Sequence, residues 1–287
     1  ALGKAEARQA VPCDFHSLLA SVRIGALYLI GPAMLPLEES FTGPLNPRLK
    51  TLLIGGGSSA RSVQSPPSLR LTLPPTRQYA DAQVDDYHDL SRARFPWRPP
   101  LRLTLRARAS SPSPTGTLGF GFWNDPFTFS LGQGGAARKL PASPNTAWFF
   151  YASPPNQMEL APGVPGHGWK AATLNGGHPP ALLLAPAAAV MGAMMAVPGV
   201  RTLAMGIARR AVRASEQLLD TRLDEWHAYE IVWEAGRVEF RVDGREVHES
   251  RNPPTPPLGF VAWIDNQYAV ASREGKFGFG VVPTKGE

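Results

Sequence analysis

Apolar and polar residues alternate in short segments along most of the chain after about residue 38. In residues 99–109, Leu101, Leu103 and Leu105 fall on one face of an extended backbone, and arginines fall on the other. A period of two with one polar face is typical of a half-buried antiparallel strand. The same kind of segment recurs at residues 68–73, 118–123, 147–152, 229–233, 238–242, 258–264 and 277–282.

Turn signals separate these segments. The chain has 30 prolines and 28 glycines, which fall between the apolar runs rather than in one tract. Asp243-Gly244 is a two-residue hairpin signal, because a type I′ turn needs a positive φ at both central positions. Strands at this spacing, without alternating helices, predict an all-β sandwich or barrel.

One long segment departs from this pattern and predicts helices. Residues 171–200 contain no Asp, Glu, Lys or Arg, and apolar residues then recur at helical spacing up to residue 219. We expect a helical insertion at about 181–219, made of two helices parted at Pro198. Pro186 and Pro198 have eleven residues between them, so a transmembrane helix of roughly 20 residues is not expected.

The second predicted helix has a basic side. Arg209, Arg210 and Arg213 lie among its apolar residues on the more polar face. Such a side is suited to contact an anionic membrane surface from outside, without crossing it.

The N-terminal residues are expected to stand apart from the sandwich, as a segment 1–37 before a domain 38–287. Residues 17–35 are apolar and follow basic residues, as in a signal peptide. However, Arg23 interrupts them and no small-residue cleavage site follows. A targeting segment and a plain packing helix both stay open, and the helix is favoured.

Composition and charge exclude some classes of protein. Hydrophobic residues make up 43% and charged residues 18%, which is typical of a globular chain. The formal charge is +6, but the arginines are scattered and no Lys/Arg run is interleaved with stacking aromatics, so nucleic acid is not expected as a partner. Cys13 is the single cysteine, which rules out an intrachain disulfide and a thiolate metal cluster.

Residues 226–233 (WHAYEIVW), followed by 237–244 (RVEFRVDG), resemble a strand pair of the family-16 glycoside hydrolases. These laminarinase-like enzymes belong to the concanavalin A-like lectin/glucanase superfamily. The resemblance implies an all-β jelly-roll sandwich of two antiparallel sheets whose concave face binds a polysaccharide. It also favours a secreted or cell-envelope location over a cytoplasmic one.

The catalytic motif of that family is missing. The resemblance implies two glutamates and an aspartate on one strand (E-x-D-x-E), but the best-matching segment, 147–153 (AWFFYAS), has no carboxylate. We therefore expect a carbohydrate-binding or catalytically altered protein. The first alternative is a glycoside hydrolase with relocated carboxylates, for which Asp125 with Asp265 are candidates.

Two strands carry an unusual alternation of glycine and aromatic residues. Gly119 and Gly121 share a face with Trp123, whereas the phenylalanines between them share the other face, which we expect to be the intersheet core. Residues 277–280 (FGFG) repeat this separation. Glycine inside a strand often marks the close approach of another group. That group is either a ligand or the Met-rich insertion packing onto the glycines, and under such a roof an apolar small molecule is the second alternative ligand.

Polar residues that directly follow apolar strands complete the candidate ligand site. These residues are also ordinary turn formers. The acidic stretch 81–89 is more simply a solvated strand edge or loop than an acid/base or cation site. The histidines show no metal-ligand spacing, and no phosphate loop or nucleophile elbow is present, so no metal and no cofactor is expected. The remaining candidates are Asn124, Trp148, Tyr151, Asn266 and Tyr268.

Overall fold

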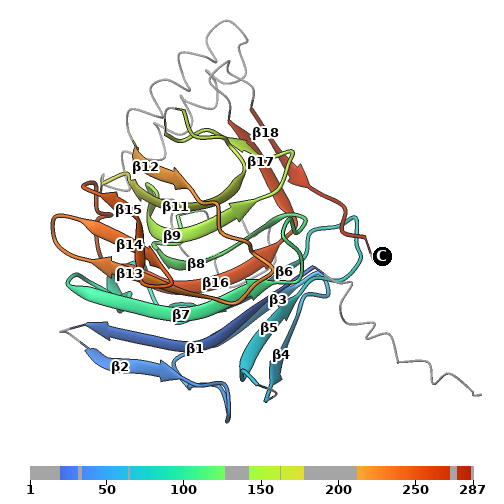
Figure 1. The fold of residues 1–287 in the computed structure, drawn as a ribbon, viewed down its shortest axis with the longest axis horizontal. Helices are drawn as coiled ribbons and strands as arrows, with labels where there is room; N and C mark the ends of the chain where they lie inside the picture. The colour runs from blue at the N-terminus through green and yellow to red at the C-terminus, as the bar shows by residue number, and fades with distance from the viewer. Residues whose placement is uncertain are drawn as a thin grey trace, which may run out of the picture.

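The structure, a computed structural model, describes residues 20–31, 34–63, 65–126, 142–161, 163–177, 212–271 and 277–285. They form two large antiparallel sheets and one small three-stranded sheet (Figure 1). The prediction of an all-β sandwich is confirmed. Within these residues no helix is long and apolar enough to span a membrane. One short 3-10 helix, η2 (Arg92–Arg94), is present there.

The first large sheet has eight strands in the order β15-β14-β13-β7-β1-β5-β4, and β2 also pairs with β1. Its strands are β1 (Ser21–Gly31), β2 (Met34–Glu39), β4 (Ser58–Ser62), β5 (Ser68–Thr72), β7 (Leu101–Ala109), β13 (His227–Trp233), β14 (Val238–Val242) and β15 (Arg245–Ser250).

The second large sheet has seven strands in the order β12-β11-β9-β8-β16-β6-β3. Its strands are β3 (Lys50–Ile54), β6 (Asp81–Asp85), β8 (Thr117–Trp123), β9 (Asn145–Ala152), β11 (Gly168–Asn175), β12 (Arg213–Leu218) and β16 (Gly259–Asp265). The small sheet has the order β10-β17-β18, formed by β10 (Gln157–Met158), β17 (Gln267–Ala271) and β18 (Phe277–Val281).

The core lies between the two large sheets. Alternate residues of each strand point into it, and apolar side chains at those positions form one continuous buried cluster. Burying each large apolar side chain contributes roughly 1.5–3 kcal/mol. The sequence correctly places six of the largest inward: Phe120, Phe122, Tyr229, Ile231, Trp233 and Phe240.

The predicted hairpin turn at Asp243-Gly244 joins β14 to β15. Both residues have a positive φ, 49° and 78°, as a type I′ turn requires. The Asp243 carboxylate also accepts a hydrogen bond from the Ala228 backbone N–H at 2.8 Å and lies 2.6 Å from His227 Nδ1. This explains why an aromatic-His strand and a Val-Asp-Gly turn occur together.

The helix expected within residues 17–35 is wrong where the structure describes them. Residues 21–31 are β1, which pairs with β2, β5 and β7. A register shift between Ile24 and Leu27 explains the error. Val22 and Ile24 face the core before it, and Leu27 and Leu29 face the core after it, so no single period of two is visible. The sandwich therefore begins before residue 38. Residues 1–19 lie outside the described residues.

The C-terminal part of the expected helical insertion is also wrong. Arg213–Leu218 is β12 and pairs along its whole length with β11. Ala214 and Leu218 are four residues apart, a spacing that suits one face of a helix and one face of a strand equally well. Residues 181–211 of the predicted insertion, with Arg209 and Arg210, lie outside the described residues.

The second glycine-aromatic strand is not part of the main core. β18 belongs to the small sheet, and its Phe279 is 72% exposed. The expectation that the phenylalanines of residues 277–280 pack between the large sheets is therefore wrong for Phe279. Its glycines also differ: Gly280 lies under the Tyr268 ring, whereas a Cβ on Gly278 would meet no atom of the described residues within 4 Å.

Candidate functional site

The outer face of the 7-stranded sheet points away from the 8-stranded sheet and carries a second aromatic cluster together with carboxylates. We call it the aromatic face. Antiparallel pairing places its residues in rows across the strands. One row is Asp81, Asp265 and Thr117; the next is Gln83, Trp263, Gly119, Phe150 and Lys170; the third is Asp85, Val261, Gly121, Trp148 and Ala172.

Four rings form the centre of this face: Trp123, Trp148, Phe150 and Trp263. The Trp148 ring lies 6.0 Å from Trp123, 5.5 Å from Phe150 and 5.3 Å from Trp263, measured between centroids. Trp123 and Trp263 are parallel within 6° at 6.4 Å. Three of the four are only partly buried, and Trp263 is 8% exposed. Together they make a partly exposed patch of packed rings, in which Trp148 is tilted by 38° to Trp123 and by 45° to Trp263, and we call this patch the aromatic platform.

The strand glycines make room for these rings. A Cβ on Gly119 would lie 2.7 Å from the Trp263 ring and 2.4 Å from the Phe149 carbonyl oxygen. A Cβ on Gly259 would lie 2.2 Å from the Tyr87 ring. The close approach that the glycines signal is therefore made, in the described part of the chain, by aromatic side chains of the same sheet.

A chain of hydrogen bonds lies beside the platform. The Tyr87 hydroxyl oxygen accepts from Trp123 Nε1 at 2.6 Å and from Gln83 Nε2 at 3.2 Å. Gln83 Nε2 also donates to Asp85 at 2.7 Å, and the backbone N–H groups of Tyr87 and His88 donate to the same carboxylate. Burial raises the pKa of Asp85, although these hydrogen bonds favour its charged form. The network fixes the edge of the platform.

Asp81 and Asp265 are direct neighbours on adjacent strands, and we call them the acid pair. Such opposite residues have Cβ atoms about 4.5–5.5 Å apart. Thr117 Oγ1 donates to Asp265 Oδ1 at 2.8 Å and accepts from Trp263 Nε1 at 3.1 Å, so the pair is connected to the platform. Burial raises the pKa of Asp265 to about 6. Burial, Asp265 and Asp85 raise the pKa of Asp81 well above its usual range.

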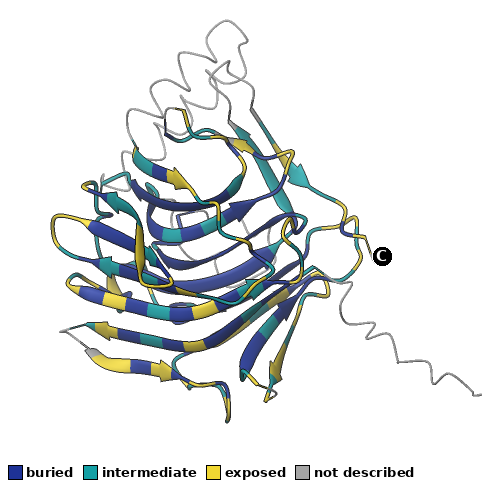
Figure 2. Ribbon diagram, viewed as in Figure 1, coloured by how far each residue is buried: buried dark blue, intermediate teal, exposed yellow. Residues whose placement is uncertain are grey.

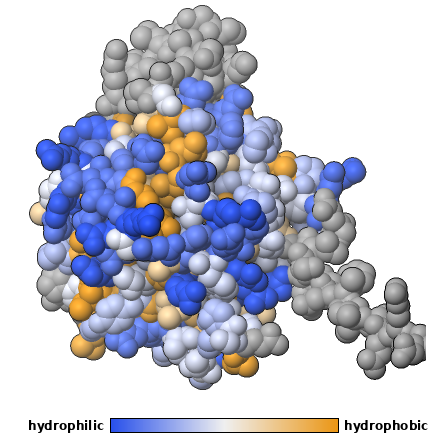
Figure 3. Space-filling view, in the orientation of Figure 1, coloured by the Kyte–Doolittle hydropathy of each residue, from blue (hydrophilic) through white to orange (hydrophobic). Residues whose placement is uncertain are grey.

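At the other side of the face, Lys170 and Glu216 form a buried ion pair. Lys170 Nζ lies 3.4 Å from Glu216 Oε2, and the two side chains are 1% and 2% exposed. Burial raises the pKa of Glu216, while Lys170 acts in the opposite direction. Glu216 belongs to β12, which is the edge strand of this sheet. The last residue of β12, Leu218, is 41% exposed. Apolar side chains come to the surface near this strand, in the upper half of Figure 3.

The structure brings part of the predicted ligand site together. Gly119, Gly121, Trp123 and Trp148 lie side by side on the aromatic face. Tyr151 does not, because odd spacing along β9 turns it to the opposite face, where it is 6% exposed in the intersheet core.

The predicted polar ligands have structural roles. Asn124 and Asn266 are 2% and 0% exposed. Asn124 bonds the backbone of residues 143 and 145, and Asn266 bonds that of residues 78, 80 and 282. Tyr268 lies in the small sheet, where its ring covers Gly280. The two asparagines hold loops in place.

Asp125 and Asp265 cannot act on one bond. Asp265 pairs with Thr117 at the start of β8, whereas Asp125 follows Trp123 at its end. Six strand residues span about 20 Å. The hypothesis that these two carboxylates cooperate is therefore wrong, and Asp265 is instead the neighbour of Asp81.

Sequence reasoning missed several residues of this face. The stretch 81–89 is not a solvated edge, because its first seven residues are buried. The sequence carried part of the signal: Asp81, Gln83 and Asp85 alternate with Ala82 and Val84, which indicates a strand with one polar face, but the alternation does not tell whether that face is solvated or buried. The other residues missed are Tyr87, Phe150, Lys170, Glu216 and Trp263.

Comparisons with known proteins add little. No protein-family model matches the chain, and no curated protein matches it. Among solved structures, a glycosidic hydrolase matches at 10% identity over 91% of each chain with a TM-score of 0.35. An endo-β-1,3-glucanase from Pyrococcus furiosus matches at 10% identity over 84% of this chain and 72% of its own, with a TM-score of 0.34. A GlcNAcα1-4Gal-releasing endo-β-galactosidase from Clostridium perfringens matches at 11% identity over 83% and 59%, with a TM-score of 0.38.

These neighbours are glycoside hydrolases. With TM-scores below 0.5, these similarities do not indicate the activity of the present chain. Its function has to be inferred from the side chains of the aromatic face.

Proposed function

We propose that the protein is a glycan-binding sandwich of the concanavalin A-like type, and that the aromatic face holds the glycan. The observation that carries this proposal is the aromatic platform. Rings that pack on one another while staying partly exposed leave part of their apolar area open to a ligand. A flat sugar ring with apolar C–H faces fits such a surface, and aromatic side chains combine large contact area with polar edges.

The surroundings of the platform suit a polyhydroxylated ligand. Binding sites combine an apolar lining with a few fixed polar groups. Here the partly exposed Asp265 borders one side, and it is held in one orientation by hydrogen bonds from Thr117 Oγ1 and the Gln267 backbone N–H. On another side Asp85 is fully buried and accepts a hydrogen bond from the Gln83 amide, which it thereby holds in place. A ligand would therefore meet a preorganised acceptor at Asp265.

Binding of β-linked oligosaccharides, measured by calorimetry or glycan array, tests the proposal. We expect the Trp148→Ala variant to lose binding, because it removes the central ring of the platform. Phe279→Ala is the matched control, because that aromatic side chain is exposed on the small sheet. Thermal melting of both variants separates lost binding from lost folding. Oligosaccharide binding that survives in folded Trp148→Ala protein would place the ligand elsewhere.

Hydrolysis is the alternative outcome of the same test. The strand β9 presents Thr146, Trp148 and Phe150 on the aromatic face and no carboxylate there. We therefore expect no reducing-end release from laminarin or lichenan. Turnover that disappears in Asp81→Asn or Asp265→Asn would make the protein an enzyme that uses the acid pair.

An apolar small molecule is the other alternative ligand. Native mass spectrometry of purified protein checks it directly, because a retained lipid-like molecule would add a defined mass. We expect the mass of the chain alone.

A further inference from the structure

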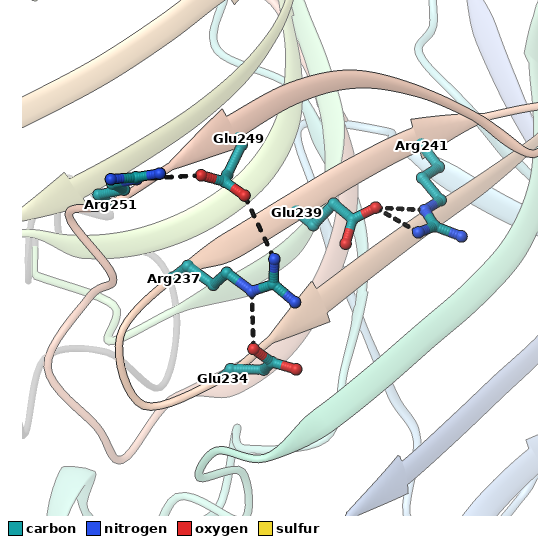
Figure 4. Close-up of polar contacts among 6 residues, drawn as sticks. All are labelled: Glu234, Arg237, Glu239, Arg241, Glu249 and Arg251. Carbon is teal, nitrogen blue, oxygen red and sulfur yellow. Dashed lines mark hydrogen bonds and ion pairs between the residues drawn. The ribbon is translucent and has the colours of Figure 1, made fainter.

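Two pairs of acidic residues lie directly opposite each other in the sheets, and only one has counter-ions among the described residues. Glu239 and Glu249 are opposite on β14 and β15. Arg241 pairs with Glu239, and Arg237 and Arg251 pair with Glu249 (Figure 4). This pair shows how the fold stabilises two adjacent carboxylates, namely with arginines.

The acid pair Asp81–Asp265 has no such cation. In the described part of the chain, no Lys, Arg or His forms an ion pair with either carboxylate. Asp81 is 5% exposed, and its Oδ1 atom is buried without a hydrogen-bond partner. An unpaired buried acceptor costs about 1–3 kcal/mol, so this site is incomplete as it stands.

The groups that face Asp81 from each packed element are neutral or acidic. On β3 the opposite residue is Ile54, and the nearest lysine of that strand, Lys50, lies opposite Asp85. Asp85 and Asp265 are the charged neighbours on β6 and β16, and both raise the pKa of Asp81. Burial raises the pKa of Tyr79, and both acids of the pair raise it further.

The acid pair also adjoins the aromatic platform. Asp265 is two residues beyond Trp263 on the same face of β16, and Thr117 bonds to both. Carboxylates beside aromatic rings recognise organic cations, because the ring faces and the acids both attract positive charge. A metal ion is a poor fit, since no group of three or more His, Cys, Asp or Glu side chains that could hold one occurs in the described residues.

We propose that the glycan bound on the aromatic face is an amino-sugar oligomer, whose ring stacks on the platform and whose ammonium group lies against Asp81 and Asp265. This inference rests on the proposed function and names its ligand class. The ammonium donates a hydrogen bond to the acid pair and supplies the positive charge that arginines supply to the other acid pair. A neutral hydroxyl could donate the hydrogen bond but not the charge.

Binding of an ammonium should also release a proton. Burial and neighbouring acids raise the pKa of Asp81, which favours its protonated form in the free protein. A bound cation favours the charged carboxylate and lowers that pKa. Proton release measured by calorimetry in two buffers of different ionisation enthalpy should therefore accompany binding of the amino sugar but not of a neutral sugar.

Three β-1,4-linked oligomers of equal length make the test, because they differ at carbon 2 alone. Oligomers of glucosamine carry an ammonium there, those of glucose a hydroxyl, and those of N-acetylglucosamine an acetamide. At about pH 6 we expect the glucosamine oligomer to bind at least about tenfold more tightly than the other two. Asp81→Asn and Asp265→Asn should each remove this preference, whereas Glu249→Gln, in the neutralised pair, should leave it unchanged.

The outcomes separate the two proposals. Equal binding of all three oligomers overturns the amino-sugar inference and leaves glycan binding standing. Failure of all three, together with a negative array, overturns glycan binding itself. Spermidine that competes as strongly as the glucosamine oligomer, independently of Trp148, would show that the site takes amines and not sugars, which also overturns the inference.

Discussion

The outer faces of the two large sheets differ in what water can reach. In the 8-stranded sheet, β7 alternates between buried positions and positions that are exposed or partly exposed, and its outward residues include Arg102, Arg106 and Arg108 (Figure 2). In the 7-stranded sheet, β8 and β16 are buried at six of seven positions each, on both faces. Water solvates the charges of the first face. On the second, side chains have to satisfy one another, which is why unusual chemistry concentrates there.

The largest expected effect on stability comes from breaking the buried ion pair of Lys170 and Glu216. Glu216→Gln leaves Lys170 buried without its counter-ion, which should lower the free energy of unfolding by about 3 kcal/mol or more. Glu234→Gln removes an exposed partner of Arg237 in the 8-stranded sheet and should leave the urea midpoint nearly unchanged. Urea unfolding of both variants gives the comparison.

A second variant checks the cause. The double change Lys170→Met with Glu216→Leu removes both buried charges and should recover most of the lost stability. If the single change Glu216→Gln is as mild as Glu234→Gln, the aromatic face is more hydrated than its burial indicates.

The next largest effect on stability is expected from a steric clash at a strand glycine. Gly119→Ala places a methyl group 2.4 Å from the Phe149 carbonyl oxygen and 2.7 Å from the Trp263 ring, so we expect a loss of about 1–3 kcal/mol. Gly236→Ala, in the turn between β13 and β14, meets no atom within 4 Å and should change stability by less than about 0.5 kcal/mol. Thermal unfolding distinguishes them. Similar melting temperatures would mean that Trp263 moves aside easily.

The smallest expected effect is the pH dependence of stability. Raising the pH should lower the stabilising contribution of Asp265 on the aromatic face and raise that of Glu249 on the 8-stranded sheet. Burial raises the pKa of Asp265 from 3.8 to about 6, so its stabilising contribution is complete below pH 3.8 and is lost as the pH rises through 6. Asp265→Asn should therefore reduce the loss of stability between pH 3.8 and pH 6. Part of the loss should remain, because burial also raises the pKa of Asp86, to about 7.

On the 8-stranded sheet, the hydrogen bond from Arg251 lowers the pKa of Glu249. Its contribution is present above the ordinary value of 4.5 and is lost as the pH falls. Glu249→Gln should reduce this acid sensitivity. Unfolding midpoints measured from about pH 3 to pH 8 test both signs, and equal slopes in the two variants would contradict the comparison.

Much of the fold was predictable because it rests on local alternation. The Gly-Phe pattern of β8 gave the correct inward face, and the Asp243-Gly244 turn was correct, since both depend on neighbouring residues alone. β1 was not predictable in this way, because a register shift hides its alternation.

The acid pair could not be found from the sequence. Asp81 and Asp265 meet because β6 lies beside β16, and no local pattern encodes that register. The alternation of Asp81, Gln83 and Asp85 is typical of residues that share one face of a strand, but this stretch was interpreted as a solvated strand edge or loop. Charged residues were assigned to solvent by default, which is correct for the arginines of β7 and wrong for the carboxylates of β6.

The amide of Asn266 has a consequence for how this fold can be dissected. Its oxygen accepts from the backbone of Ala80, and its nitrogen donates to the carbonyl groups of Gln78 and Val282. One side chain thus joins the approach to β6, the end of β16 and the segment after β18. The small sheet is therefore not a detachable module: trimming away the segment after β18, or grafting the small sheet onto another sandwich, also removes a hydrogen bond of the amide that holds the approach to β6, the strand that presents Asp81.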